Sequence, residues 1–389
     1  MKKVIFIQNE DALGGIWYVN KTIGEALAKR GYDVRIVSVR GGSNCIQKDI
    51  SNVKIDIIND KYSWDLVRKK DVLFPLKKLK IITFFKMLIK YIKSHIMLKN
   101  DFKKLKQYII LNKPDYILAS QYQTLYGIPK QYLSRTLYEH HASFDFLMEA
   151  KDNFRVLKKY NSRIYGYIWL SKAALNKAKN NGFNKSICLP NPIRFFSEKK
   201  ADVIRNKKIV VISRIENYNK RINKMISFVD DVFKNEKFKD WVFEIYGVGE
   251  FDTESQRIID TNKQIIYKGS TNNPKDILLN SSINLNTSIF EGFSMSILEA
   301  SMCGVPTITF NHGESTNEEV INDKTGYIIE QNNDNEYKRK LEYIMANEKE
   351  LERLSLGCKE YSNNFVVDKV VENWINLFKE MDEVEYEEN

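Results

Sequence analysis

Short apolar runs alternate with amphipathic stretches along the whole chain, and this alternation limits the available folds more than any other feature. Strands that alternate with helices pair in parallel, and helices then cover both faces of the sheet. The sequence therefore predicts an α/β chain with doubly wound parallel sheets. The expected strands cover residues 3–8, 33–39, 53–58, 115–120, 136–140 and 165–171 in the first half, and 207–214, 241–247, 263–269, 283–288 and 306–310 in the second.

The chain has 389 residues, which is more than one ordinary core needs and fits two domains. A polar segment at 193–206 separates the two runs of strands, so we place the first domain at 1–195 and the second at 196–364. The amphipathic stretch 365–381 is predicted to form a helix that packs back on the first domain, followed by an acidic tail to residue 389.

The formal net charge is +11, and the excess is concentrated in one stretch. Residues 68–108 hold 13 Lys or Arg against 2 Asp or Glu. Within 77–96, apolar and basic side chains fall on different faces of a helix, which is typical of helices that lie on anionic membranes. The alternative is a solvated face of an ordinary domain helix. The apolar face of this helix comprises Ile81, Phe85, Leu88, Ile92 and Ile96, and the basic face comprises Lys86, Lys90 and Lys93. No nucleic-acid recognition motif accompanies the charge, so we expect no nucleic-acid partner.

Several classes of protein are disfavoured by the sequence. No apolar run reaches the roughly 18 residues that span a bilayer, and the apolar core of the N-terminus is only VIFI, which reads as a first strand rather than a signal peptide. The four cysteines are far apart, which argues against zinc or a disulfide framework and for a reducing cytoplasm. They are Cys45, Cys188, Cys303 and Cys358.

Two carboxylates, Glu291 and Glu299, lie in the stretch EGFSMSILEASMCGVPTITF. Gly292 frees the backbone beside the first, and Ser294 is a candidate N-cap for a helix that carries the second. Eight residues of helix span about 12 Å, roughly the length of a sugar–diphosphate–ribose unit. One carboxylate would hold sugar hydroxyls and the other ribose hydroxyls, with the diphosphate at the helix N-terminus.

Two cations follow one strand of the second half. Arg214 ends the run 207–214 and Lys220 comes six residues later, so both would project from the end of the same strand and clamp a diphosphate. The alternative is a pair of ordinary surface cations. Gly14-Gly15 after the first strand, and Gly247 after the strand 241–247, would let the backbone approach a phosphate, a sugar or a base, although plain turns also use glycine.

His140 and His141 end an apolar segment, where a neutral histidine would donate to a sugar hydroxyl, or serve only a structural role. The chain contains no Asp-x-Asp motif, so we expect a metal-independent site without a cofactor. It also contains no Gly-x-x-x-x-Gly-Lys-Ser/Thr loop, which disfavours a P-loop kinase.

These motifs together resemble the retaining glycosyltransferases of family 4, which have the GT-B fold. The resemblance covers nearly the whole chain and rests mainly on SRIENYNKR (213–221), EIYGVGE (244–250), the two glutamates and ASMCGVPTI (300–308). The first domain contributes the Gly14-Gly15 segment and LYEHHAS (137–143). The loop reads Gly-Phe-Ser where Gly-Phe-Gly is common, and the segment 310–321 replaces a loop richer in Gly and Pro.

The resemblance implies roles for the matching residues. Glu291 would hold the donor sugar and Glu299 the ribose, while Arg214 and Lys220 would neutralise the departing diphosphate. Gly15 would approach donor phosphates or acceptor, and His140 or His141 would lie beside the sugar at the reacting face. Backbone amides would contact sugar or phosphates at Gly292, Phe293, Ser294 and Met295.

The expected activity is transfer of a sugar from a nucleoside-diphosphate donor to an acceptor hydroxyl, with retention of configuration at the anomeric carbon. The expected donor is a UDP-sugar. We expect the reaction to serve the synthesis of bacterial cell-surface polysaccharides or glycoconjugates. The acceptor stays open between a glycan, a lipid-linked sugar and a protein, and the enzyme is expected in the cytoplasm, at or near the inner face of the membrane. Two alternatives remain: a nucleotide-sugar epimerase of the same fold, and a non-catalytic subunit of a glycosyltransferase complex.

Overall fold

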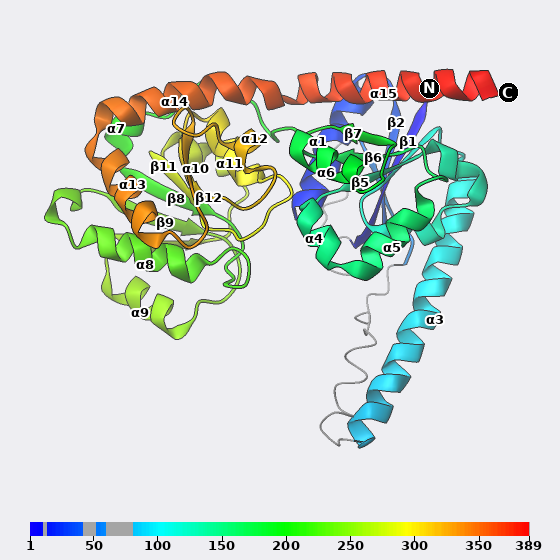
Figure 1. Ribbon diagram of the computed structural model, residues 1–389, viewed down its shortest axis with the longest axis horizontal. Coiled ribbons are helices and arrows are strands. Elements are labelled where there is room, and N and C mark those ends of the chain that lie inside the picture. Colours follow the sequence, from blue (N-terminus) through cyan, green and yellow to red (C-terminus); the bar gives the residue numbers. More distant parts are fainter. Residues whose placement is uncertain (11–13, 42–51, 60–80, 389) are drawn as a thin grey trace. The chain divides into compact units, whose positions relative to one another are not determined.

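The computed structural model describes residues 1–10, 14–41, 52–59 and 81–388 (Figure 1). By contacts the chain divides into two compact units. The first comprises Met1–Glu139, Arg155–Ile168 and Leu377–Asn389, and the second comprises His140–Phe154 and Trp169–Asn376. The domain boundaries inferred from the sequence, near residues 195 and 364, stay a prediction.

The first sheet has seven strands in the order β3-β2-β1-β4-β5-β6-β7. Neighbours pair in parallel from β3 to β5. The chain runs outward from β1 to β3 and then returns to the other side of β1 with β4. The order of strands therefore reverses between β1 and β4. The strands are β1 Lys3–Glu10, β2 Asp33–Arg40, β3 Lys54–Ile57, β4 Tyr116–Ala119, β5 Thr136–His140, β6 Gly166–Trp169 and β7 Ser186–Cys188.

Central strands of this sheet are apolar on both faces because helices cover both. In β1, Val4, Ile5, Phe6 and Ile7 are all fully buried, which is the pattern of a parallel sheet between two helical layers. The helices described up to residue 180 are α1 Gly15–Lys29, α3 Ile81–Asn112, η1 Tyr122–Gly127, η2 Lys130–Arg135, α4 Phe144–Glu149, α5 Lys151–Tyr160 and α6 Lys172–Asn180.

The second sheet has six strands in the order β10-β9-β8-β11-β12-β13, and its neighbours pair in parallel. Here the chain runs outward from β8 to β10 and returns beside β8 with β11, so the order reverses between β8 and β11. The strands are β8 Lys208–Ile212, β9 Val242–Tyr246, β10 Ile265–Gly269, β11 Ile283–Asn286, β12 Thr307–Phe310 and β13 Gly326–Ile329.

Amphipathic helices cover the second sheet and complete one core. In α8, Ile222, Met225, Ile226 and Val229 recur at helical spacing and are buried against the sheet. The helices are α7 Val203–Asn206, α8 Ile222–Phe233, η3 Glu236–Phe238, α9 Thr253–Thr261, α10 Pro274–Leu279, α11 Met295–Met302, α12 Thr316–Glu319, α13 Asp334–Ala346, α14 Glu348–Ser362, η4 Asn363–Phe365 and α15 Val367–Glu388.

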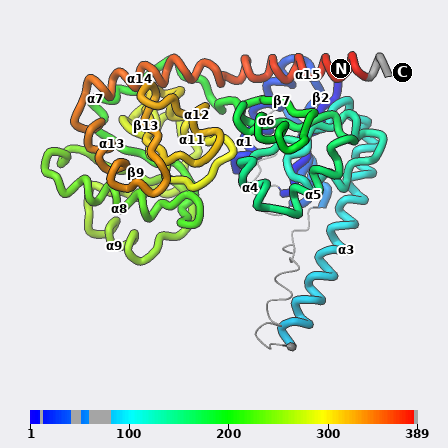
Figure 2. The backbone as a smooth tube through the Cα atoms, viewed as in Figure 1, coloured from blue at the N-terminus to red at the C-terminus, as the bar shows by residue number. Residues whose placement is uncertain are grey.

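The C-terminal part of α15 packs in the first unit, as the sequence predicted. The Phe378 ring stacks on the ring of Tyr116 from β4, with centroids 4.2 Å apart. The Tyr116 hydroxyl donates to Asp382 at 2.8 Å, and the Lys2 ammonium donates to the same carboxylate at 3.0 Å. The start of the chain and the end of α15 therefore lie side by side (Figure 2).

All eleven predicted strands occur, and the structure adds β7 and β13, which the sequence analysis missed. The basic helix was predicted for residues 77–96. The described helix α3 runs to Asn112, and residues 77–80 lie outside the described part of the chain. Its exposed apolar stripe also differs from the prediction, because Leu88 is partly covered and Ile89 is exposed in its place.

Candidate active site

Lys220 and Glu291, a predicted cation and a predicted carboxylate, meet because β8 and β11 are neighbours at the point where the strand order reverses. Arg214 and Lys220 follow β8, and Glu291 follows β11. In open α/β sheets, ligands bind outside the carboxyl ends of the strands at such a reversal. The fold therefore places the loops that carry these three residues at the position where a doubly wound sheet offers a crevice.

The loop between β8 and α8 is held by one carboxylate. Glu216 accepts hydrogen bonds from the backbone N–H groups of Asn219 at 3.0 Å and Lys220 at 2.8 Å. Arg221, at a positive φ of 50°, donates through Nε to the Thr287 carbonyl at 2.7 Å, which ties the end of this loop to the segment after β11. Arg214, at the other end of the loop, is exposed to solvent.

Lys220 and Glu291 form an ion pair. The Lys220 ammonium donates to Oε1 of Glu291, and the Ser288 hydroxyl donates to the same oxygen at 2.7 Å. Burial by itself raises the pKa of Glu291, but the charges of Lys220 and His312 and these two hydrogen bonds outweigh it, so the pKa is lowered. The two residues were predicted to contact different parts of a donor, and the structure shows that they contact each other.

Asn219 joins the two loops that carry this pair. Its Oδ1 accepts from the backbone N–H groups of Ile289 at 3.2 Å and Phe290 at 3.0 Å, and its Nδ2 donates to the Phe290 carbonyl at 3.0 Å. Asn219 is buried and lies directly before Lys220, while Phe290 lies directly before Glu291. The side chain thus fixes the register of one loop against the other.

Gly292 leaves room for the backbone of His141. A Cβ placed on Gly292 would lie 2.1 Å from the His141 carbonyl oxygen, so no larger residue fits here. His140 is buried beside Trp169, with ring centroids 5.3 Å apart, and its Nε2 lies 3.3 Å from the Ser143 carbonyl. Burial lowers the pKa of His140 to about 4, and the Ser143 contact opposes this only partly. His140 is therefore neutral at pH 7, and the histidine segment lies against the glutamate loop.

Glu299 lies in α11 and is held by Arg194. The guanidinium Nε donates to Oε1 and Nη2 donates to Oε2 at 2.7 Å, a two-pronged contact on a carboxylate that is only 2% exposed. The sequence analysis did not single out Arg194, because it stands in a polar stretch that was interpreted as a linker.

The start of α11 combines a free backbone end with buried side chains. Ser294 occupies the N-cap position as predicted, but its hydroxyl accepts no backbone N–H and instead lies 3.2 Å from the Ser296 hydroxyl. The Phe293 side chain is buried in an apolar cluster with Leu298 and Phe365. Phe293, and equally Gly292, can therefore meet a ligand only through the backbone.

The predicted glycines differ in what surrounds them. Gly247 has a φ of +157°, and a Cβ on it would lie 1.7 Å from the Ser213 carbonyl, so close packing within the protein already explains this glycine. Gly15 begins α1 in the first unit, after Gly14 at its N-cap. Among the residues described, no atom lies within 4 Å of a Cβ on either of these two, so their backbone is open to an approaching group.

His312 and Glu319 form a buried pair that the sequence analysis missed. His312 Nε2 lies 3.3 Å from Glu319 Oε2, and both side chains are fully buried. Burial tends to lower the pKa of His312, but the charges of Glu319 and Glu291 raise it overall, against the opposing charge of Lys220. The sequence analysis noted only that the segment 310–321 replaces a loop richer in Gly and Pro, and it singled out neither residue.

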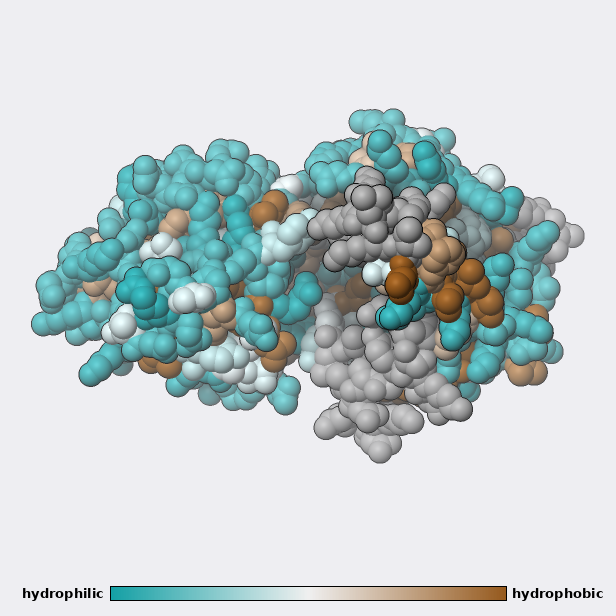
Figure 3. Space-filling view, turned by 90° about the horizontal axis from the view of Figure 1, so that it is seen from below, coloured by the Kyte–Doolittle hydropathy of each residue, from teal (hydrophilic) through white to brown (hydrophobic). Residues whose placement is uncertain are grey.

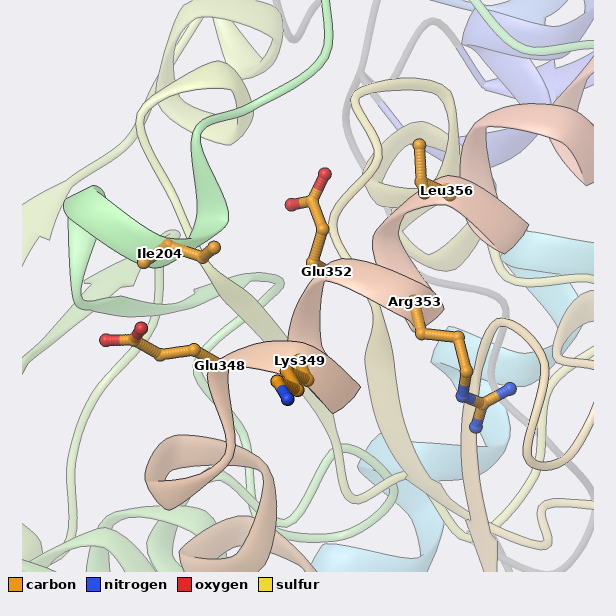
Figure 4. Close-up of a pocket in the computed structure, with 6 residues that line it drawn as sticks. All are labelled: Ile204, Glu348, Lys349, Glu352, Arg353 and Leu356. Atoms are coloured by element: carbon orange, nitrogen blue, oxygen red, sulfur yellow. The ribbon is translucent and has the colours of Figure 1, made fainter.

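The second unit holds cavities of different kinds. One of about 10 Å³, about the room of a single water molecule, is lined by Lys220, Ser288, Ser213 and Ser296 among others. A surface pocket of about 460 Å³ is lined by Ile204 of α7 and by five residues of α14 (Figure 4). No predicted site residue lines this larger pocket. In the described part of the chain, no three His, Cys, Asp or Glu side chains are grouped to hold a metal ion.

The fold and the comparisons with known proteins agree on the class of protein. The chain has the GT-B fold, and residues 193–360 match the family described as Glycosyl transferases group 1, which supports a glycosyltransferase activity. The part of the chain that carries the match includes Arg194, Lys220 and both glutamates.

Three similar proteins are informative. An uncharacterized glycosyltransferase of Haemophilus influenzae is 25% identical over 96% of this chain and 99% of its own. A poly(ribitol-phosphate) alpha-N-acetylglucosaminyltransferase of Staphylococcus aureus is 27% identical over 61% of this chain and 49% of its own. The crystal structure of HepE from Anabaena in complex with UDP-glucose superposes with a TM-score of 0.73 at 14% identity, over 98% of this chain and 100% of that one, which supports the fold.

Proposed function

We propose that this glycosyltransferase moves a sugar from a UDP-sugar to an acceptor hydroxyl with retention of configuration, as in family 4, during assembly of a bacterial cell-surface polysaccharide or glycoconjugate. The observation that carries the proposal is the Lys220–Glu291 pair at the strand-order reversal, followed by the start of α11. The UDP-glucose complex of HepE and the polymer-directed relative from S. aureus support the donor and the acceptor class.

In the proposed reaction, the bond between the anomeric carbon and the β-phosphate oxygen breaks as the acceptor oxygen bonds to the same face of that carbon. The acceptor proton passes to the leaving phosphate, so no protein base is required. The Lys220 ammonium has three N–H donors, of which Glu291 takes one, so the others remain for the diphosphate. Arg214 and the α11 N-terminus stabilise the developing negative charge, and Glu291 holds sugar hydroxyls.

The test begins with a panel of UDP-, GDP- and ADP-sugars, measured by thermal shift and by donor turnover, with NMR of the product to establish the anomeric configuration. Arg214→Ala should lower kcat/KM by about 10²-fold or more, because one contact to the developing charge is worth on the order of 3 kcal/mol. Full activity in that variant overturns the role of Arg214. Unchanged activity in EDTA is expected for a site that needs no metal ion.

Two other activities give different results in the same assays. A nucleotide-sugar epimerase converts its donor to a new nucleotide sugar without any acceptor. A non-catalytic subunit turns over no donor alone and gains activity only with its partner. The proposal requires transfer by the isolated chain that depends on an added acceptor.

We also propose that α3 docks on an anionic membrane surface. Ile82, Phe85, Ile89, Ile92 and Ile96 form an exposed stripe on this helix, each 48–75% exposed, and hydrophobic side chains gather on the face where α3 projects toward the viewer (Figure 3). Residues 81–100 contain four lysines and no Asp or Glu, so the charge favours an anionic surface over a second copy of the same helix. No described helix is long and apolar enough to cross a bilayer.

Sedimentation with vesicles tests this docking. The wild type should bind vesicles that contain phosphatidylglycerol at low salt, and Ile89→Asp should weaken binding about tenfold or more, since it places a charge in the apolar stripe. Leu356→Asp, at a residue of α14 with nearly the same exposure as Ile89 (56% against 54%), is the matched control and should bind like the wild type. Equal binding by both variants excludes α3 as the docking surface.

A further inference from the structure

Arg194 controls the orientation of Glu299. The two donor groups of its planar guanidinium meet the two oxygens of the carboxylate side on. This geometry fixes both the position and the plane of a carboxylate, which a lysine cannot do with its single ammonium. Glu299 is almost fully buried, whereas Arg194 is 23% exposed. A buried charge needs such a partner, so the orientation of Glu299 depends on Arg194.

Arg194 is itself held in place by its neighbours in sequence. Ile193 is buried in the cluster that contains Leu298 and Met302 of α11, and Phe195 packs against the same cluster. The backbone N–H of Ile193 also donates to the Phe365 carbonyl at 2.8 Å. The backbone on both sides of Arg194 is thus anchored to the helix that carries Glu299, and the guanidinium is preorganised against its carboxylate.

The pair leaves part of the carboxylate available. An ionised carboxylate has about four acceptor positions, and a two-pronged arginine takes two of them, one on each oxygen. Each oxygen then keeps one position for another donor. Two neighbouring hydroxyl groups on one ring present two donors at the spacing of the two carboxylate oxygens, and the 2′- and 3′-hydroxyls of a ribose are such a pair.

We infer that Arg194 is a specificity-determining positioning residue, which orients Glu299 toward the ribose hydroxyls and thereby makes the site select ribonucleotides over 2′-deoxyribonucleotides. The inference rests on the proposed function, since it requires that Glu299 meets the donor's ribose. A pair with a purely structural role would affect the melting temperature, but it would not affect discrimination between two ligands that differ by one hydroxyl group.

Isothermal titration calorimetry with UDP and 2′-deoxy-UDP tests the inference. The wild type should bind UDP about 10- to 100-fold more tightly, the range expected for one hydrogen bond to a charged group. Glu299→Gln and Arg194→Gln should each reduce this ratio at least about fivefold, and Arg194→Lys should give an intermediate ratio because lysine keeps the charge without the planar geometry. Melting temperatures measured in parallel report folding.

Lys200→Gln is the matched control. Lys200 lies 3.0 Å from Glu352 in another ion pair of the same unit, and its loss should leave the UDP to 2′-deoxy-UDP ratio unchanged. A folded Arg194→Lys variant that keeps the wild-type ratio overturns the inference, and this variant decides the matter if Arg194→Gln does not fold. A wild type that binds both ligands equally also overturns it, yet leaves the proposed function standing. A wild type that binds neither ligand overturns both.

Discussion

The Lys220 ammonium and the Glu291 carboxylate form an ion pair although 71 residues separate them in sequence. Both follow strands at the reversal point of the second sheet, and Ser288 donates to the same carboxylate oxygen at 2.7 Å. A cation and a carboxylate in direct contact can hold the two sides of one scissile bond, with the diphosphate on the cation and the sugar on the carboxylate. Their roles should then be inseparable.

Lys220→Ala and Glu291→Gln should each lower kcat/KM by about 10²–10³-fold, because each removes a contact to the reacting groups. The kcat/KM of the double variant should be little lower than that of the less active single variant, because the effects of residues that act as a unit are strongly non-additive. Steady-state kinetics on all four proteins measures the coupling. Lys208→Ala is the control, because Lys208 lies 3.1 Å from Glu244 in another partly buried pair, and its loss should leave kcat/KM unchanged. Fully additive losses would show that Lys220 and Glu291 work independently.

Much of this site is predictable from sequence because its residues follow strands, and the carboxyl ends of parallel strands meet at one edge. Arg214, Lys220 and Glu291 were predicted in this way. Their mutual contact was not, because it depends on β8 and β11 being neighbours. Strand order is a property of long-range pairing, and no local pattern in either loop encodes it.

The residues that sequence reasoning missed have a common physical cause. Arg194 lies in a polar stretch, but Ile193 and Phe195 on either side of it are apolar and anchor it to α11. His312 and Glu319 lie in the mostly polar segment 311–319, which includes α12, yet their side chains are fully buried. Buried ionic pairs look like surface residues in a sequence, since only tertiary packing removes them from water.

Gly292→Ala should destabilise the protein and lower activity. The new methyl group would meet the His141 carbonyl at 2.1 Å, and a backbone carbonyl can move only with its whole segment. We expect a loss of about 1–3 kcal/mol in the free energy of unfolding, measured by urea titration. Gly15→Ala meets no described atom within 4 Å and should keep the wild-type stability. A Gly292→Ala variant as stable as Gly15→Ala would contradict the close approach of the two segments.

His140 should make the protein less stable in acid. Its folded pKa of about 4 lies below the value of 6.5 for an accessible histidine, so between these pH values the unfolded chain binds a proton that the folded chain does not. Stability should therefore fall as the pH drops from about 6.5 to about 4, by on the order of 3 kcal/mol. Urea titrations of the wild type and His140→Gln across this range measure the difference. The variant should lack this part of the pH dependence, and identical slopes would rule out a buried neutral histidine.

His312 should have the opposite effect. Its pKa is raised in the folded protein, so folding takes up a proton, and the resulting stability is fully present below about pH 6.5. This contribution should disappear as the pH rises through the folded pKa. Its full size is about 1.4 kcal/mol for each pH unit by which the pKa of His312 is higher in the folded than in the unfolded chain. The stability difference between the wild type and His312→Gln should accordingly shrink from pH 6 to pH 9. Glu319→Gln removes the partner carboxylate and should abolish most of this pH dependence. If the stability difference between the wild type and His312→Gln grew with pH instead, it would contradict the pairing.

Asn219→Ala should lower activity even though Asn219 is assigned no contact with the substrate. The substitution removes three hydrogen bonds that hold the Lys220 loop against Phe290 and leaves buried backbone groups with fewer partners. Each of these hydrogen bonds contributes about 0.5–1.5 kcal/mol, so their loss should lower the free energy of unfolding by about 2 kcal/mol. Because the two loops are then held less firmly in register, kcat/KM should fall at least tenfold at temperatures where the variant is folded.

The matched control for this prediction is Asn206→Ala. The Asn206 side chain also joins separate segments, donating to the carbonyls of Leu279 at 3.2 Å and Ser281 at 3.3 Å, but these residues precede β11 and lie at the opposite end of the sheet from Glu291. Asn206→Ala should therefore lower the melting temperature to a similar extent while kcat/KM of the folded enzyme stays at the wild-type value. Equal losses of activity in both variants would show that stability alone, and not the register of the Lys220 and Glu291 loops, limits the rate.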